Sequence, residues 1–299
     1  MLNIQVPATS ANLGPGFDSL GLALKIYNNF IFEKIDTGVK IEIKSDNGQK
    51  IDIPFEKNLI FKTLKKFEKE SKIKVNKIKI VEKSKIAIAR GLGSSATAIV
   101  ATLYGLNKIY NNPFKKDKLI KMACEIEGHG DNVVPAFIGG FTISVLENNQ
   151  LIYEKISVKD EKLKVILIIP DFKLKTSDLR KVLPKKINHQ DAVYNSGRTA
   201  LLTSIFANNK WDKLSVAMKD KLHQDYRAKL IPGFKSIINT GYEAGVLGMA
   251  LSGAGPTIIA FTRKNPEKIA KKLVKTFSDF GITSDYIVTS IDNRGIMSN

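Results

Sequence analysis

Apolar and polar positions alternate along some segments of the chain and recur every third or fourth residue along others. Alternation is typical of half-buried strands, and in the first half it predicts strands over 2–6, 77–89, 137–146 and 150–158. Residues 30–35 and 39–44 flank Asp36-Thr37-Gly38, which predicts a hairpin. Helical spacing predicts helices over 59–70, 95–109 and 115–127.

The second half begins with an apolar run over 164–170, a predicted buried strand, and helical patterns fill 188–245. Predicted strands over 247–251 and 257–261 meet at a glycine turn. A helix from Pro266 to about residue 277 leads to a last strand over 282–289. We therefore expect an α+β chain with two lobes, 1–155 and 156–299, and a boundary near 150–162.

The composition is that of an ordinary globular protein: 299 residues, of which 43% are hydrophobic and 25% charged. No apolar run approaches the ~18 residues that span a bilayer, and MLNIQVPATS does not have the pattern of a signal peptide. The single cysteine, Cys124, excludes a disulfide framework. We expect a cytoplasmic location and no membrane association.

The net charge of +18 comes from 47 basic and 29 acidic residues, and 41 of the basic residues are lysines. Such a charge first suggests a nucleic-acid partner. In the lysine-rich segment 57–85, however, the lysines alternate with apolar helix and strand positions, and aromatic residues do not punctuate the lysines as base-stacking platforms would. We expect a solvated surface, or a field that attracts anions, and no nucleic-acid binding.

The segment ARGLGSSATAIVA, residues 89–101, places a glycine turn before an apolar helix. Free backbone amides and the helix dipole make such a helix N-terminus an anion site, although a tight turn with an ordinary capped helix would look the same. The P-loop pattern GxxxxGK[ST] is absent. Phosphate binding is one of the two readings that this segment allows.

Two further glycine segments lie near the chain ends. In the first, PATSANLGPGFDSLGLAL, Asn12 and Asp18 flank Gly14-Pro15-Gly16, an arrangement that suits an ammonium-bearing ligand but also a surface turn. In the second, LSGAGPTIIAF, the small residues 252–255 would let another backbone approach closely, unless they form only a hairpin turn.

Together, PATSANLGPGFD, GLGSSA and SGAGPT resemble the three ordered motifs of the GHMP small-molecule kinases, over essentially the whole chain. EIEGHGDNVVPAFIGGF, KTSDLRKVLP and YRAKLIPGF are similar to the homoserine kinase branch of that superfamily. Three positions depart from the family pattern, namely Ala87, Gly130 and Ala254, and none of them removes a charged or nucleophilic group.

The resemblance implies a ribosomal-S5-like N-terminal lobe that binds ATP and a ferredoxin-like C-terminal lobe, with the active site between them. It implies ATP- and Mg²⁺-dependent phosphorylation of the L-homoserine side-chain hydroxyl to O-phospho-L-homoserine, on the route to threonine. It also implies a homodimer. The alternatives are a different GHMP kinase, acting on shikimate or a mevalonate-pathway substrate, and a nucleic-acid-binding protein.

The resemblance also assigns the nucleotide site. Asn58 would contact the adenine, and Ser95 and Glu125 would hold the magnesium ion. Glu127 lies about 200° further round a helix, so both carboxylates cannot easily face one metal, and Glu127 is expected to be solvated or capping. The triphosphate would lie along Ala87, Ile88, Ala89, Arg90, Gly91, Leu92, Gly93, Ser94, Ser95, Ala96 and Thr97.

For the amino acid, Arg180 and Arg227 would bind the carboxylate, because the guanidinium fork matches its geometry. The remaining substrate-binding residues would be Asn12, Asp18, His129 and Asp131, with Asp18 pairing the ammonium group. Asn132 and Thr176 would orient the hydroxyl and the γ-phosphate. Asp131 could instead act as a general base, although phosphoryl transfer depends mainly on positioning and charge neutralisation.

Overall fold

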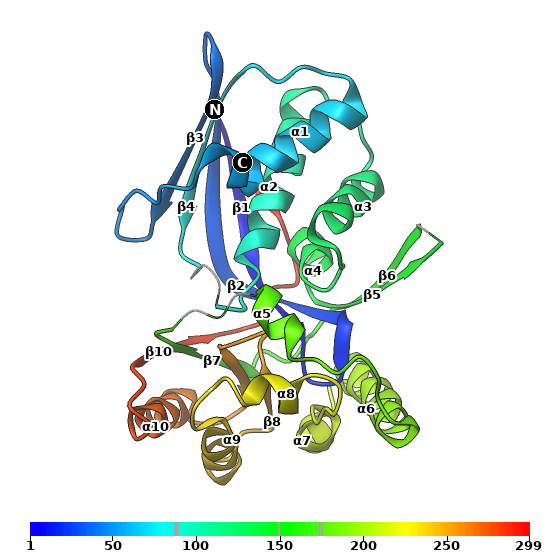
Figure 1. Ribbon diagram of the computed structural model, residues 1–299, viewed down its shortest axis with the longest axis vertical. Coiled ribbons are helices and arrows are strands. Elements are labelled where there is room, and N and C mark those ends of the chain that lie inside the picture. Colours follow the sequence, from blue (N-terminus) through cyan, green and yellow to red (C-terminus); the bar gives the residue numbers. More distant parts are fainter. Residues whose placement is uncertain (87–89, 149, 173, 175) are drawn as a thin grey trace.

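The computed structural model describes residues 1–86, 90–148, 150–172, 174 and 176–299, without the side chains of residues 176 and 177 (Figure 1). Two sheets divide the chain. The first holds β1 to β6 and the C-terminal β11, and the second holds β7 to β10. Figure 1 shows the two sheets in separate lobes, one above the other, with α5 at the junction between them.

The first sheet has the order β11-β1-β2-β4-β3, and β5 and β6 extend it from β2. Its strands are β1 (Leu2–Asn12), β2 (Gly16–Lys34), β3 (Gly38–Ser45), β4 (Lys77–Ser84), β5 (Phe141–Glu147), β6 (Gln150–Ile156) and β11 (Met297–Ser298). Its helices are η1 (Phe55–Lys57), α1 (Leu59–Ser71), α2 (Ser94–Ile109), α3 (Lys116–Glu127) and α4 (Val133–Ile138).

The predicted hairpin between residues 30–35 and 39–44 is wrong. β4 lies between the two segments, antiparallel to β2 (Phe30 opposite Glu82) and parallel to β3 (Ile41 opposite Ile80). β4 is mostly buried, whereas β3 is largely half-exposed. β4 takes the central position, where both of its edges are paired, and the more exposed β3 becomes the edge.

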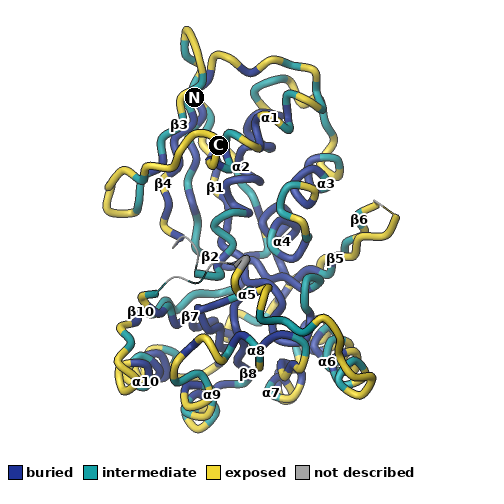
Figure 2. Tube along the Cα trace, viewed as in Figure 1, coloured by how far each residue is buried: buried dark blue, intermediate teal, exposed yellow. Residues whose placement is uncertain are grey.

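Helix α1 shows how the lysine-rich segment folds. Its buried residues, Ile60, Thr63, Leu64 and Phe67, lie three or four positions apart and pack into the core of the first lobe. Its lysines lie on the other faces of the helix, most of them half-exposed or fully exposed. In Figure 2 the interiors of both lobes are buried, and exposed residues gather on the outer helices and loops. This placement favours the interpretation of a solvated lysine surface.

The second sheet is antiparallel, with the order β10-β7-β9-β8. Its strands are β7 (Lys164–Pro170), β8 (Gly248–Leu251), β9 (Ile258–Thr262) and β10 (Ser284–Thr289). Its helices are α5 (Thr176–Lys181), α6 (His189–Asn208), η2 (Trp211–Lys213), α7 (Leu214–Ala217), α8 (Gln224–Ala228), α9 (Phe234–Glu243) and α10 (Pro266–Ser278). Successive residues of β7 point to opposite faces, and each face carries its own core: Val165 and Leu167 on one, Ile166 and Ile168 on the other.

Two other boundaries differ from the prediction. Residues 137 and 138 end helix α4 instead of beginning a strand, and the chain end returns to the first lobe, where β11 pairs with β1.

Across the described residues, no helix is both long enough and apolar enough to cross a bilayer.

Candidate active site

The main cavity lies where the three glycine segments meet. Its lining includes Asn12 from the first segment, residues 90–95 from the central one and Gly253 and Ala254 from the third. Arg180 and Arg227 from the second lobe line the same cavity. One cavity therefore holds most of the residues that the sequence singled out, although they lie far apart along the chain.

The third glycine segment supports the central one by direct contact. Ser252 Oγ donates a hydrogen bond to the carbonyl oxygen of Gly91 at 2.6 Å. A Cβ atom on Gly91 would lie 2.2 Å from the carbonyl oxygen of Ser252, and one on Gly93 would lie 1.9 Å from Thr9 Oγ1. Both glycines also have positive φ, so no other residue fits these positions. The predicted close backbone approach is confirmed.

Helix α2 begins directly behind this loop. Its N-cap is Gly93, and no side chain of the described residues caps it, so the first amides are left for another acceptor. The side chains of Ser94 and Ser95 line the cavity. Ala96 and Thr97 are instead buried, and the Thr97 hydroxyl donates to the Ser94 carbonyl oxygen. Ala87, Ile88 and Ala89 lie outside the described residues.

The two candidate metal-binding carboxylates of α3 have the opposite arrangement to the one predicted. Glu125 forms an ion pair with Lys66 of α1 at 2.8 Å and is absent from the lining of the main cavity. Glu127 lines that cavity and accepts a hydrogen bond from Ser95 Oγ at 2.6 Å. This geometry favours Glu127 over Glu125 as the metal-binding carboxylate. Glu127 follows Ile120 and Ala123 at helical spacing, and this signal would have placed it on the inner face.

The pair of Ser95 and Glu127 fits a divalent cation. Mg²⁺ prefers oxygen ligands and usually takes one or two from the protein, and a hydroxyl and a carboxylate meet here beside an anion-binding helix terminus. Burial raises the pKa of Glu127, because nearby positive charge does not offset the loss of water. A bound cation would supply that charge and keep the carboxylate ionised.

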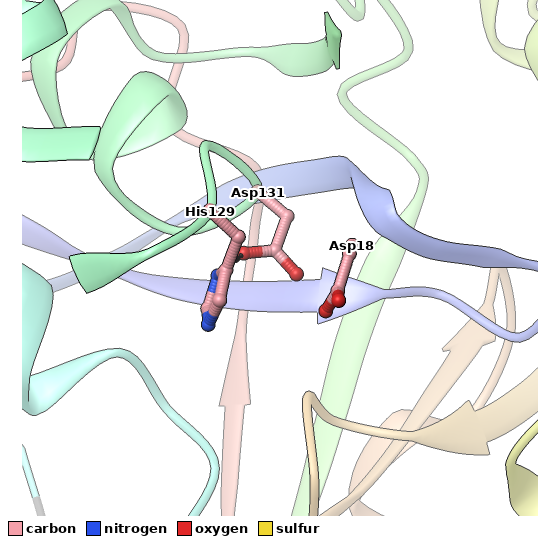
Figure 3. A group of neighbouring side chains, drawn as sticks. All are labelled: Asp18, His129 and Asp131. Carbon is pink, nitrogen blue, oxygen red and sulfur yellow. Dashed lines mark hydrogen bonds and ion pairs between the residues drawn. The ribbon is translucent and has the colours of Figure 1, made fainter. Parts of the chain in front are cut away.

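A second polar cluster lies beside the loop between α3 and α4. In Figure 3, His129 and Asp131 from that loop face Asp18 from β2, and one polar atom of each lies within 4.8 Å of the others. His129 Nδ1 is hydrogen-bonded to Asp131 Oδ1. Burial is the largest single influence on the pKa of His129 and lowers it, but the hydrogen bond to Asp131 and the nearby carboxylate charges together raise that pKa. The predicted pocket residues therefore lie together.

The side chain of Asn12 forms hydrogen bonds within the protein. Its Nδ2 donates to the carbonyl oxygen of Gly253 at 2.8 Å, and its Oδ1 accepts from the Asp18 amide at 3.0 Å. Asn12 thus ties the first glycine turn to the third. Both ends of its side chain are engaged, so its predicted contact with the substrate ammonium stays a prediction.

Two arginines reach the cavity from the second lobe. Arg180 forms a fork with Asp18, at 2.9 and 3.2 Å, and Arg227 is buried. Both guanidinium groups lie near the Phe17 ring, with Cζ at 5.7 and 5.2 Å from its centre. Burial, and then the charge of Arg180, lower the pKa of Arg227 to about 10. An anion between the two cations would relieve their repulsion.

Of the two predicted orienting residues, the structure describes the side chain of Asn132 but not that of Thr176. Asn132 lines the cavity, where its Oδ1 accepts from Thr9 Oγ1 at 2.8 Å and its Nδ2 donates to Asp131 at 3.3 Å. Thr176 begins α5, and its side chain lies outside the described residues.

The remaining end of the cavity is largely apolar and lies against the start of α1. Asn58 caps that helix by accepting from the Ile60 amide at 2.9 Å, and it lines the cavity beside Ile43, Ile53 and Leu59. Glu82, which the sequence analysis missed, lines the same end and accepts from Asn28 Nδ2 at 3.1 Å. In the sequence, Glu82 continues the alternating row of Ile78 and Ile80, and this spacing would have indicated a buried charged residue.

Glu82 makes stability depend on pH. Burial raises its pKa from 4.5 to about 7, so the folded state loses stability as the pH rises between these values. Glu82→Gln keeps an acceptor for Asn28 but cannot ionise. We expect the free energy of unfolding of the variant, relative to that of the wild type, to increase by up to about 3 kcal/mol from about pH 5 to about pH 8. Urea unfolding of both proteins at the two pH values measures this difference. Equal differences at both pH values would contradict this expectation.

Comparison with known proteins identifies relatives that match along the whole chain. Residues 58–140 match the model of the GHMP kinases N terminal domain, and residues 202–279 match that of the GHMP kinases C terminal domain. The chain is 48% identical to a homoserine kinase of Halothermothrix orenii, over 99% of this chain and 96% of that protein. It is 44% identical to one of Clostridium beijerinckii, over 99% and 97%.

Among solved structures, the homoserine kinase from Cytophaga hutchinsonii superposes with a TM-score of 0.88 at 30% identity, over 100% of this chain and 97% of that one. The sequence matches and this structural match extend over both lobes and both sheets. The chain therefore belongs to the GHMP kinase superfamily and, within it, to the homoserine kinase family.

Proposed function

We propose that this protein transfers the γ-phosphoryl group of ATP to the side-chain hydroxyl of L-homoserine. The observation that carries the proposal is that one cavity is lined by two anion-binding features. These are the open N-terminus of α2, suited to phosphate, and the pair of Arg180 and Arg227, suited to a carboxylate. The homoserine kinases that match over the whole chain support this substrate.

The nucleotide would lie with its triphosphate along residues 90–95 and its base in the apolar end beside Asn58 and Glu82. Mg²⁺, held by Ser95 and Glu127, would neutralise charge on the phosphate oxygens. The amides at the start of α2 would stabilise the same negative charge from the protein side.

The amino acid would bind at the other end of the cavity. Arg227 and Arg180 would take its carboxylate, and Asp18 would take its ammonium group. Asp18 is already paired with Arg180. The substrate would replace this ion pair by two others, one between its ammonium group and Asp18 and one between its carboxylate and Arg180. Asn132, fixed by Thr9, would orient the hydroxyl toward the γ-phosphate. Phosphoryl transfer of this kind depends on positioning more than on a strong base.

The proposal is tested by measuring ADP release with L-homoserine, mevalonate, shikimate and galactose as acceptors, each with ATP and Mg²⁺. We expect homoserine to be phosphorylated with the highest kcat/KM of the panel. Phosphorylation of mevalonate or shikimate without phosphorylation of homoserine would overturn the assignment. A product other than O-phospho-L-homoserine would also overturn it.

Asp131→Asn separates substrate binding from base catalysis. A general base contributes about 10²- to 10⁴-fold to the rate. We propose that Asp131 mainly orients His129 and the bound substrate, and we therefore expect kcat to fall by less than about tenfold while the KM for homoserine rises. Steady-state kinetics in homoserine at saturating ATP measure both values. A fall in kcat beyond about a hundredfold would identify Asp131 as the base.

Three further expectations follow from the family resemblance and belong to this proposal. The enzyme would act as a homodimer and in the cytoplasm, and it would have no nucleic-acid partner. Light scattering at several protein concentrations tests the first expectation, and a salt-dependent RNA-binding assay tests the last.

A further inference from the structure

His223 lies fully buried just before α8 and contacts two of the segments that form the cavity. Its Nε2 lies 2.7 Å from the carbonyl oxygen of Gly14, in the first glycine turn, and its Nδ1 lies 3.1 Å from Arg227 Nη1. Asp220 accepts hydrogen bonds from the backbone amides of His223 and Gln224, at 2.8 and 2.7 Å, which fixes the start of the helix. The imidazole therefore has little freedom to rotate.

These two contacts define the protonation state of the ring. A carbonyl oxygen only accepts, so Nε2 must carry a hydrogen for Gly14. A guanidinium nitrogen only donates, so Nδ1 must be free of hydrogen for Arg227. The neutral imidazole with its hydrogen on Nε2 is the one form that satisfies both partners. A second hydrogen, on Nδ1, would point at an N–H group of Arg227.

The surroundings of the ring favour this neutral form. Burial, the largest influence, lowers the pKa of His223, and the charge of Arg227 lowers it further. Asp220 and Asp18 act in the opposite direction but do not outweigh the burial. On its remaining side the ring packs against Phe17, with 5.3 Å between the ring centres.

Arg227 is held by three acceptors from three different segments. Its Nε donates to the Leu179 carbonyl oxygen of α5 at 3.2 Å. Its Nη1 lies 3.1 Å from His223 Nδ1 and donates to the Gly253 carbonyl oxygen at 3.3 Å. Its Nη2 makes no hydrogen bond with any described residue, and Arg227 lines the cavity. The guanidinium plane is thus fixed while one amino group is left for a ligand.

We propose that His223 is a positioning residue whose neutral imidazole accepts from Arg227 and holds the guanidinium group at the angle that the acceptor substrate's carboxylate requires. This inference rests on the proposed function, in which that carboxylate belongs to homoserine. His223 acts only through Arg227. Its loss should therefore weaken recognition of the carboxylate without touching the nucleotide end of the cavity.

Two amide substitutions separate the two contacts of the ring. In His223→Gln the amide reaches the place of Nε2, which keeps a donor for Gly14 and removes the acceptor for Arg227. In His223→Asn the amide lies at the place of Nδ1, which keeps an acceptor for Arg227 and removes the donor for Gly14. Each variant is thus the matched control for the other.

We expect His223→Gln to raise the KM for homoserine roughly ten- to a hundredfold, the range for losing one hydrogen bond to a charged group. The kcat and the KM for ATP should change by less than about threefold. His223→Asn should keep the KM for homoserine within about threefold of the wild type. Preference for homoserine over its methyl ester should fall in the Gln variant and persist in the Asn variant.

The opposite ranking, with Asn the more damaging variant for homoserine, would overturn the proposal and leave His223 as a support for the Gly14 turn. An unchanged ratio of acid to ester in His223→Gln would also overturn it. If His223→Gln does not fold, as judged by circular dichroism, His223→Asn decides alone: a KM within about threefold supports the proposal, and a rise beyond about tenfold contradicts it. A wild-type enzyme that does not phosphorylate homoserine would instead refute the proposed function, whatever the variants do.

Discussion

Glu127→Gln should lower kcat by roughly 10²- to 10³-fold and raise the Mg²⁺ concentration needed for half-maximal activity. Glutamine keeps an oxygen beside Ser95 Oγ, 2.6 Å from the carboxylate in the wild type, but it removes the negative charge. Charge stabilisation by a bound metal is worth several kcal/mol, and about 1.4 kcal/mol corresponds to tenfold in rate. Initial rates over a series of Mg²⁺ concentrations, at constant ATP, measure both effects.

Glu125→Gln is the matched control for this experiment, because it makes the same chemical change two residues away on the same helix. Glu125 is paired with Lys66 on the side of α3 that faces α1. An exposed or half-exposed ion pair of this kind contributes about 1 kcal/mol or less to stability. We expect near-wild-type kcat and Mg²⁺ dependence. A larger kinetic effect of Glu125→Gln than of Glu127→Gln would reverse the assignment.

Arg227→Leu should lower kcat/KM for homoserine by roughly 30-fold to several thousandfold. Loss of one partner of a buried, hydrogen-bonded charge pair costs about 2–5 kcal/mol, and about 1.4 kcal/mol corresponds to tenfold. The dissociation constant of ATP should change little, because in the proposed arrangement Arg227 binds the amino acid and not the nucleotide. Steady-state kinetics in homoserine and equilibrium binding of ATP measure the two effects.

Two controls separate carboxylate binding from a general loss of structure. Arg227→Lys should recover only part of the activity, because an ammonium group lacks the planar fork of a guanidinium group. The wild type should prefer homoserine to its methyl ester, and Arg227→Leu should prefer it much less. Thermal unfolding of each variant shows whether the lost bonds to Leu179 and Gly253 matter for stability. The same ratio of acid to ester in both enzymes would contradict the role of Arg227.

The difference between Glu125 and Glu127 shows where local reasoning stops. Helical geometry separates the two carboxylates, and the spacing of Glu127 from Ile120 and Ala123 places Glu127 on the apolar face, but neither observation identifies the residue that Glu127 meets. That neighbour depends on how α3 packs against the core through residues such as Ile120 and Ala123. Their burial sets the rotation of the helix about its axis, and this rotation brings Glu127 to Ser95.

The partner of β3 was undetermined for a related reason. The short connection at Asp36-Thr37-Gly38 permits a hairpin, and alternation alone does not identify which strand pairs with which. β4 lies forty residues further along the chain and displaces β2 as the neighbour of β3. β4 is buried along most of its length, and its place between β2 and β3 pairs both of its edges, but that gain is a property of the whole sheet.

His223 carried almost no local signal, and Glu82 carried only its place in the row of Ile78 and Ile80. An isolated histidine is most often structural, and one glutamate in a lysine-rich strand looks like a surface charge. Their roles depend on contacts with Gly14 and Asn28, which lie 209 and 54 residues away along the chain. Chemistry that depends on such distant partners becomes visible only when the fold brings them together.

The sequence by itself determined the features that depend on neighbouring residues: the helix faces, the glycine turns with their open α2 N-terminus, and the three ordered motifs of the superfamily. These are local because backbone conformation and side-chain spacing are set within one or two turns of chain. Only the tertiary structure decided which carboxylate faces Ser95, which strand lies beside β3, and how His223 holds Arg227. These are decided by burial, and burial depends on every segment that packs against a residue.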